Sequence, residues 1–111
     1  MTQHLFVYGT LGLGGPNEHI LAAIGGTWSE AWVKGHLEAR GWGAAQGYPG
    51  IVAMDEAGDE IRGYLFTSDR LATHWQQLDK FEGDGYRRVL ATVWLDIDQT
   101  VEAYVYLLSH K

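Results

Sequence analysis

The sequence predicts an α+β protein with a mostly antiparallel, curved or barrel-like β-sheet and two inserted helices. Segments with strand character outnumber helical segments, and the two kinds do not alternate regularly as in a doubly wound fold. The chain also contains 15 glycines, which indicates many turns and close backbone approaches. Because 111 residues suffice for one hydrophobic core but not for two, we expect a single domain over 1–111.

The predicted elements begin with the run LFVY at 5–8. An unbroken apolar run of this length is typical of a short strand that is buried on both faces. It is followed by the glycine-rich loop GTLGLGGPN. Residues 17–24 can then form two helical turns, with Asn17 as the N-cap and Gly25 and Gly26 as the stop.

The middle of the chain is predicted to contain strands separated by turns. Residues 30–40 alternate as a strand does, and Gly35 within them indicates a bulge or a close backbone approach. The glycines and the proline of 41–50 predict a loop, 51–54 resumes as a strand, and 55–60 is a turn.

A second helix is expected after the strand at 60–67. Either Ser68 or Asp69 is a candidate cap for it, and the helix is predicted to run through LATHWQQLDKF at 71–81.

The last two predicted strands form a hairpin. Residues 87–97 alternate between apolar and polar side chains, and the turn DQT leads into the strand at 101–108. The face of the first strand that is expected to point inward carries Val89, Ala91, Val93, Leu95 and Ile97.

The second predicted helix carries an acid at an unexpected position. Leu71, Trp75 and Leu78 form an apolar stripe, and Glu82 occupies the next place on that stripe. Either the helix has ended and Glu82 points into water, or the acid faces a protected place. In the second case, burial would raise the pKa of the carboxyl group and make it a better proton carrier near neutral pH.

The loop after the first strand is the second candidate site. Tyr8, Gly9, Thr10 and Leu11 follow a buried strand, and such a turn can expose a row of backbone N–H groups that suits a carboxylate or a phosphate. The loop has neither the GK[ST] of a nucleotide-binding P-loop nor the glycine spacing of a dinucleotide fingerprint. The alternative interpretation is that it is only a turn.

Composition and charge exclude several classes of function. The net charge of -6, with Arg87 and Arg88 as the nearest basic cluster, argues against a nucleic-acid partner. No run approaches the length of a signal-peptide core or a membrane span, so we expect no membrane partner and a cytoplasmic location. The chain has no cysteine, its five histidines lack metal-binding spacing, and its serines lack a GxSxG setting. We therefore expect no metal site, no cofactor and no serine hydrolase.

Taken together, the motifs resemble those of the γ-glutamylcyclotransferase-like family, which includes the AIG2-like proteins and the γ-glutamylamine cyclotransferases. The likeness rests on YGTL near the start, the YPG loop, a Gly-x-Leu-x strand and LDKFEGDGYRR, in the order of the family, and it runs from Leu5 to about Leu108. The resemblance implies an α+β fold: a small mixed, mostly antiparallel β-barrel with two or more short helices and a cavity at one side.

The resemblance also implies roles for individual residues. Glu82 matches the catalytic acid/base of the family. Gly12 stands where many relatives have a basic residue, and Pro49 matches the proline of the connecting loop. The expected substrate-binding residues are Tyr8, Gly9, Thr10, Leu11, Tyr86, Arg88 and Tyr106.

The function that follows from the resemblance is a cofactor-free γ-glutamyl cyclotransferase. Such an enzyme cyclises a γ-glutamyl amine or peptide to 5-oxoproline and releases the amine. Two alternatives remain at this point: a catalytically silent protein that binds a small carboxylate on the same barrel, and an interaction module that uses exposed tryptophans. The sequence leaves open the leaving amine and the oligomeric state.

Overall fold

The computed structural model describes residues 2–40 and 47–109. Residues 41–46 of the predicted loop at 41–50 lie outside this part of the chain. The elements follow in the order β1 (Gln3–Val7), α1 (Glu18–Ile24), β2 (Thr27–Glu38), β3 (Gly50–Met54), β4 (Asp59–Ser68), the 3₁₀ turn η2 (Leu71–Thr73), α2 (Trp75–Glu82), β5 (Tyr86–Asp96) and β6 (Gln99–Leu108).

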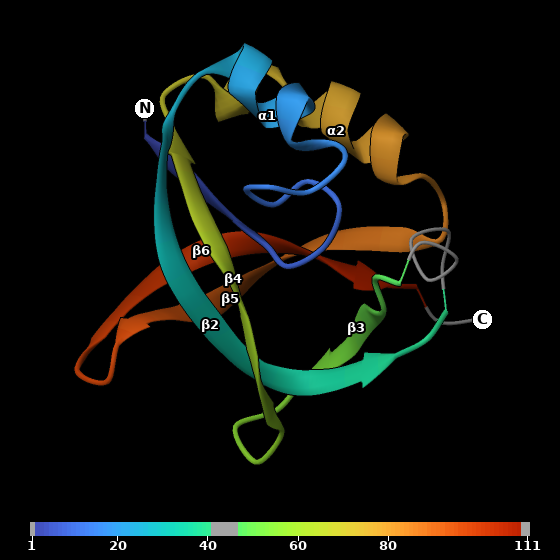
Figure 1. The fold of residues 1–111 in the computed structure, drawn as a ribbon, viewed down its shortest axis with the longest axis vertical. Coiled ribbons are helices and arrows are strands. Elements are labelled where there is room, and N and C mark those ends of the chain that lie inside the picture. Colours follow the sequence, from blue (N-terminus) through green and yellow to red (C-terminus); the bar gives the residue numbers. More distant parts are fainter. Residues whose placement is uncertain (1, 41–46, 110–111) are drawn as a thin grey trace.

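The strands form one sheet in the order β3-β2-β4-β1-β6-β5, and β2 also pairs with β5 where Trp32 lies opposite Trp94. This pairing closes β2, β4, β1, β6 and β5 into a five-stranded barrel, around which the long strand β2 curves in Figure 1. The pairing of β1 with β6 is parallel, and the other pairings among the described strands are antiparallel. The predicted α+β class with a mixed, mostly antiparallel barrel is therefore confirmed.

Strand β1 lies in the middle of the sheet and is buried on both faces. Leu5 and Val7 belong to the apolar cluster that the helices cover, whereas Phe6 belongs to the cluster inside the barrel. All three side chains are at most 4% exposed. This two-sided burial is the physical reason for the unbroken apolar run that the sequence shows at this point.

Both helices lie at the same end of the barrel (Figure 1). Their apolar side chains pack against the outward face of β1 and against Phe66 of β4 and Tyr106 of β6. The helical contribution to this cluster consists of Leu21 and Ile24 from α1 and Trp75 and Leu78 from α2, with Leu71 from the turn before α2. The predicted apolar stripe of the second helix is thus directed toward the barrel.

The two helix starts differ from the predictions. Asn17 occupies the N-cap position of α1, but its side chain makes no capping hydrogen bond, while Gly25 ends the helix with a φ of 90° as expected. The predicted continuous helix over 71–81 is interrupted, because η2 ends at Thr73 and α2 starts only at Trp75.

Neither predicted cap of the second helix acts as one, because each side chain has another partner. The hydroxyl of Ser68 donates to the carbonyl oxygen of Gly25 at 2.5 Å and accepts from the backbone N–H of Arg70 at 3.0 Å. The carboxylate of Asp69 accepts a hydrogen bond from the hydroxyl of Thr2. Both residues therefore join the end of β4 to neighbouring segments.

Two strand features test the finer predictions. A Cβ atom at Gly35 would lie 2.5 Å from the carbonyl oxygen of Ala53, and the register of β2 against β3 shifts between His36 and Leu37, so the predicted close approach and bulge are both confirmed. On β5 the predicted inward face is correct as far as Leu95, but Ile97 is 76% exposed because the strand ends at Asp96.

Among the described residues, no helix has the length and apolar character needed to span a bilayer.

Candidate active site

One cavity is lined by both of the segments that the sequence singled out, although they are about 70 residues apart. It encloses about 50 Å³, which is enough for several water molecules. It opens where β1 ends, between the loop that follows β1 and the end of α2. Its lining residues are Phe6, Val7, Tyr8, Gly9, Thr10, Leu11, Tyr48, Pro49, Glu82, Tyr86 and Tyr106.

The loop after β1 is folded by hydrogen bonds between its own backbone groups. The N–H of Gly12 donates to the carbonyl oxygen of Gly9 at 3.0 Å, and the N–H of Asn17 donates to that of Thr10 at 2.8 Å. These bonds occupy carbonyl groups, whereas the amides of Gly9, Thr10 and Leu11 have no acceptor within residues 2–40 and 47–109. A short row of N–H groups that lack an acceptor, in a loop that lines a cavity, is suited to binding an anion.

Glu82 is the last residue of α2, which ends at Gly83 with a φ of 83°. The side chain of Glu82 is half-buried and lines the cavity, so the inward alternative describes its position. Burial raises the pKa of the Glu82 carboxyl group from its ordinary value of 4.5 to about 7. A carboxyl group with this pKa exists in both protonation states near neutral pH and can both accept and donate a proton.

Two tyrosine hydroxyls at the cavity have defined hydrogen bonds. Tyr8 donates to the carbonyl oxygen of Tyr106 at 2.7 Å and accepts from the N–H of Ile51 at 3.0 Å. Tyr106 donates to the carboxylate of Asp79 at 2.6 Å. Burial raises the pKa of both phenols, and the nearby charge of Glu82 raises the pKa further in each case. Both tyrosines therefore keep their protons at physiological pH.

Arg88 is the one expected site residue that does not line this cavity among the described residues. Its Nε donates to Asp79 Oδ1 at 3.0 Å, and its Nη2 donates to Asp79 Oδ2 at 3.3 Å. The two side chains line a separate depression together with Trp75 and other residues of α2 and the turn after it. The placement of Arg88 in direct contact with substrate stays a prediction that this geometry does not favour.

Two participants were missed or underrated by the sequence analysis. Tyr48 lines the cavity next to Pro49, and the YPG motif was the signal that could have identified it. Asp79 lies three residues before Glu82, and two acids at this spacing on a helix are usually incidental, so the sequence alone does not single it out. Its side chain is 47% exposed, but it accepts hydrogen bonds from both Arg88 and Tyr106, so it is not an idle surface residue.

No group of three or more histidine, aspartate or glutamate side chains in the described part of the chain is arranged to hold a metal ion. The absence of a cofactor requirement stays a prediction, because the reaction itself must be assayed to test it.

The closed barrel, together with a cavity that a half-buried acid and the loop after β1 both line, defines a class of small α+β barrel proteins with a candidate ligand site. Within that class, the chain belongs to the family described as "Gamma-glutamyl cyclotransferase, AIG2-like", whose sequence profile matches residues 5–111. The resemblance inferred from the motifs is confirmed.

Individual relatives agree with this assignment. CG2811 of Drosophila melanogaster is 28% identical over 115 residues, which cover 99% of this chain and 72% of that protein. YkqA of Bacillus subtilis is 34% identical over 110 residues, which cover 98% of this chain but only 36% of YkqA. Both are named as candidate gamma-glutamylcyclotransferases. The chain thus spans about a third of the length of this bacterial relative.

Solved structures show the same fold. The crystal structure of YkqA matches all of this chain with a TM-score of 0.73 and 32% identity, over 37% of its own length. An AIG2-like protein from Mus musculus matches 97% of this chain and 78% of its own length, with a TM-score of 0.72 and 22% identity. The mouse protein is similar enough to support the fold but not the function.

Proposed function

We propose that the chain is a cofactor-free γ-glutamyl cyclotransferase. The substrate is a γ-glutamyl amine or peptide, which is converted to 5-oxoproline and a free amine. The observation that carries the proposal is that Glu82 and the loop residues Gly9 to Leu11 line the same cavity in a member of this family. One end of the cavity can exchange a proton, and the other can hold negative charge.

The proposed reaction moves two of the three protons of the substrate's α-ammonium group to the departing amine. The α-ammonium group cannot attack, so the Glu82 carboxylate removes the first proton from it. The α-nitrogen then forms a bond to the γ-carbonyl carbon, and the carbonyl oxygen becomes an oxyanion. Glu82 donates this proton to the departing nitrogen as the carbonyl re-forms and the bond to that nitrogen breaks. The ring nitrogen, which is positively charged after the attack, loses the second proton, and the released amine takes it up as an ammonium ion. A proton transfer of this kind contributes about 10²–10⁴ in rate.

The loop supports the same reaction in two ways. Its N–H groups can bind the α-carboxylate of the substrate, or they can stabilise the oxyanion that forms on the γ-carbonyl. A bound and folded substrate also places its own nucleophile next to the carbonyl carbon, which contributes several further orders of magnitude. The apolar wall formed by Phe6, Val7 and Leu11 limits access of water to the reacting atoms.

The test is incubation of the purified protein with a panel of γ-glutamyl amines and peptides, with detection of 5-oxoproline and the released amine. We expect turnover of at least one member, with activity that survives dialysis against a chelator. Binding of these compounds without turnover by a correctly folded protein would instead favour the silent carboxylate-binding alternative. Activity that a chelator abolishes and zinc or manganese restores would overturn the prediction that no metal is needed.

A further inference from the structure

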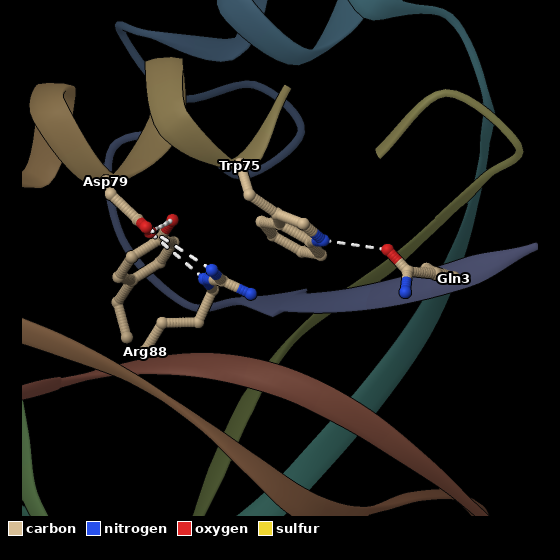
Figure 2. A network of polar contacts seen from close by, with 5 residues as sticks. Gln3, Trp75, Asp79 and Arg88 are labelled. Carbon is tan, nitrogen blue, oxygen red and sulfur yellow. Dashed lines mark hydrogen bonds and ion pairs between the residues drawn. The ribbon is translucent and has the colours of Figure 1, made fainter. Parts of the chain in front are cut away.

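The carboxylate of Asp79 connects helix α2 to the last two strands. It accepts the hydroxyl proton of Tyr106 at 2.6 Å and two hydrogen bonds from the guanidinium group of Arg88 at 3.0 and 3.3 Å. Arg88 and Tyr106 lie directly opposite each other in the β5–β6 register, so their side chains emerge on the same face of the sheet. Figure 2 shows Asp79 and Arg88 directed toward each other between α2 and the strands.

This arrangement is held in place by further contacts. The guanidinium group of Arg88 lies over the ring of Trp75 at 4.3 Å and near the ring of Tyr104 at 5.0 Å. The indole N–H of Trp75 in turn donates to the side-chain oxygen of Gln3 at 2.7 Å, as Figure 2 shows. Arg88 is only 24% exposed, so its ion pair with Asp79 has little freedom to rearrange. The position of the Asp79 carboxylate is therefore fixed from two sides.

The hydrogen bond to Asp79 determines whether the Tyr106 hydroxyl group can act as a donor or as an acceptor toward a ligand. A phenol has one proton, and that of Tyr106 is donated to a carboxylate. The phenolic oxygen consequently keeps only lone pairs for other partners, and the neighbouring negative charge makes it a stronger acceptor. Tyr8 has likewise donated its proton, to the carbonyl oxygen of Tyr106.

The residues that line the cavity therefore include two kinds of polar group. Glu82, Tyr106 and Tyr8 carry side-chain oxygen atoms, and the hydroxyl protons of both tyrosines are used within the protein. The amides of Gly9 to Leu11 supply hydrogen-bond donors instead. A ligand that carries both an ammonium group and a carboxylate matches this division.

We propose that Asp79 is a positioning residue, which orients Tyr106 so that its phenolic oxygen accepts a hydrogen bond from the α-ammonium group of the substrate. This inference rests on the proposed function and adds an orienting role to a residue outside the cavity. It also gives the family-like Arg88 a function without direct substrate contact, because Arg88 holds Asp79.

The test compares two ligands that differ only in the ammonium group: γ-L-glutamyl methylamide and the same molecule without its α-amino group. Binding is measured by calorimetry in a Glu82→Gln background, which prevents turnover and removes the Glu82 charge that would also attract the ammonium group. We expect the ammonium ligand to bind about tenfold more tightly. The preference should fall to about threefold or less in Tyr106→Phe and in Asp79→Ala. The double variant should show no further loss, because both changes remove one interaction.

Asp84→Ala is the matched control, because Asp84 is an exposed acid at the end of α2 with no hydrogen bond or ion pair among the described residues. It should leave the preference unchanged. Asp79→Asn, which keeps the shape and one acceptor oxygen, replaces Asp79→Ala if the latter does not fold, and it should give an intermediate preference. The ¹³Cζ resonance of Tyr106 should move in the Asp79 variants and not in the control, as expected for a changed hydroxyl partner.

Retention of the full preference in the folded Asp79 variants would overturn the inference, as would independent, additive losses from Asp79→Ala and Tyr106→Phe. Equal binding of both ligands by the parent protein would also overturn it while leaving the proposed function intact. If the parent bound neither ligand, the proposed function would fail together with the inference.

Discussion

The hydroxyl group of Tyr8 donates a hydrogen bond to the backbone carbonyl oxygen of Tyr106 at 2.7 Å. The same hydroxyl accepts from the N–H of Ile51 at 3.0 Å, so one side chain joins the end of β1 to β6 and β3. Tyr8 thereby fixes the start of the loop whose amides face the cavity. This role is structural, and the expected contact between Tyr8 and substrate stays a prediction.

Tyr8→Phe should destabilise the protein by about 1–3 kcal/mol, because it leaves the N–H of the fully buried Ile51 without its acceptor. Urea denaturation measures the loss. Tyr64→Phe is the control, since Tyr64 is also half-buried but its hydroxyl makes no hydrogen bond among the described residues. An equal, small effect of both substitutions would contradict the structural role of the Tyr8 hydroxyl.

Glu82→Gln should lower the turnover number by about 10² or more on whichever substrate the panel identifies, because the amide cannot carry the proton. The binding constant should change much less, since the loop amides remain. Asp79→Asn is not a suitable control, because Asp79 holds Arg88 and Tyr106. Asp84→Asn removes the same charge nearby and should keep full activity. Wild-type turnover by Glu82→Gln would remove Glu82 from the mechanism.

The pH dependence of kcat/KM should show an acid limb near pH 7. Glu82 must be ionised to accept the proton, and burial raises its pKa to about 7 from the ordinary 4.5. Below that pH the rate constant should fall about tenfold per pH unit. The limb of kcat should lie at lower pH, since a bound ammonium group favours the carboxylate. An acid limb near the ordinary glutamate value would refute the assignment.

Stability should depend on pH in the opposite sense from that of a salt-bridged acid. Because the pKa of Glu82 is higher in the folded state, the unfolded chain loses this proton first as pH rises. The contribution of Glu82 to stability is therefore fully present below about pH 4.5 and is lost as pH rises to about 7. The free energy of unfolding of Glu82→Gln, measured relative to wild type, should increase across this window by up to about 3 kcal/mol. A constant difference from pH 4 to pH 8 would show that the pKa is not raised.

5-Oxoproline in large excess should raise the melting temperature by mass action. The largest changes in amide NMR shifts should occur at Gly9, Thr10 and Leu11, whose N–H groups line the cavity. The carboxamide of 5-oxoproline, which lacks the negative charge, is the matched control ligand and should have a weaker effect. Shifts confined to residues remote from the loop would argue against an anion site there.

Much of the fold could be predicted, because the sequence patterns that indicate it each involve residues close together in the chain. The apolar run at 5–8, the stripe that ends in Glu82 and the turn glycines each report on burial or backbone conformation within a few residues. The prediction failed where a distant partner decides the outcome. The second helix starts late, and its predicted caps are used elsewhere, because Ser68 bonds Gly25 and Asp69 bonds Thr2.

The candidate site likewise has features that could be predicted from the sequence and features that could not. The cavity positions of Glu82 and of the loop could be predicted from the sequence and from the resemblance. The hydrogen bonds of Tyr8 and Asp79 could not, because their partners lie 98 and 27 residues away and depend on the strand register. No sequence pattern marks Asp79, because its contacts with Tyr106 and Arg88 exist only in the folded chain.

The parallel pairing of β1 with β6 has a consequence for the order in which the protein can form on the ribosome. β1 is synthesised before the other described strands, yet one of its two neighbours in the sheet is β6, which follows all of them in the sequence. Until β6 has emerged, the apolar β1 lacks that neighbour, and Tyr8 lacks the carbonyl oxygen that fixes the loop. Such non-local pairing makes folding slow and leaves apolar surface transiently exposed. The nascent chain therefore carries the loop of its future site through the synthesis of every element from β1 to β6 before that loop can be fixed.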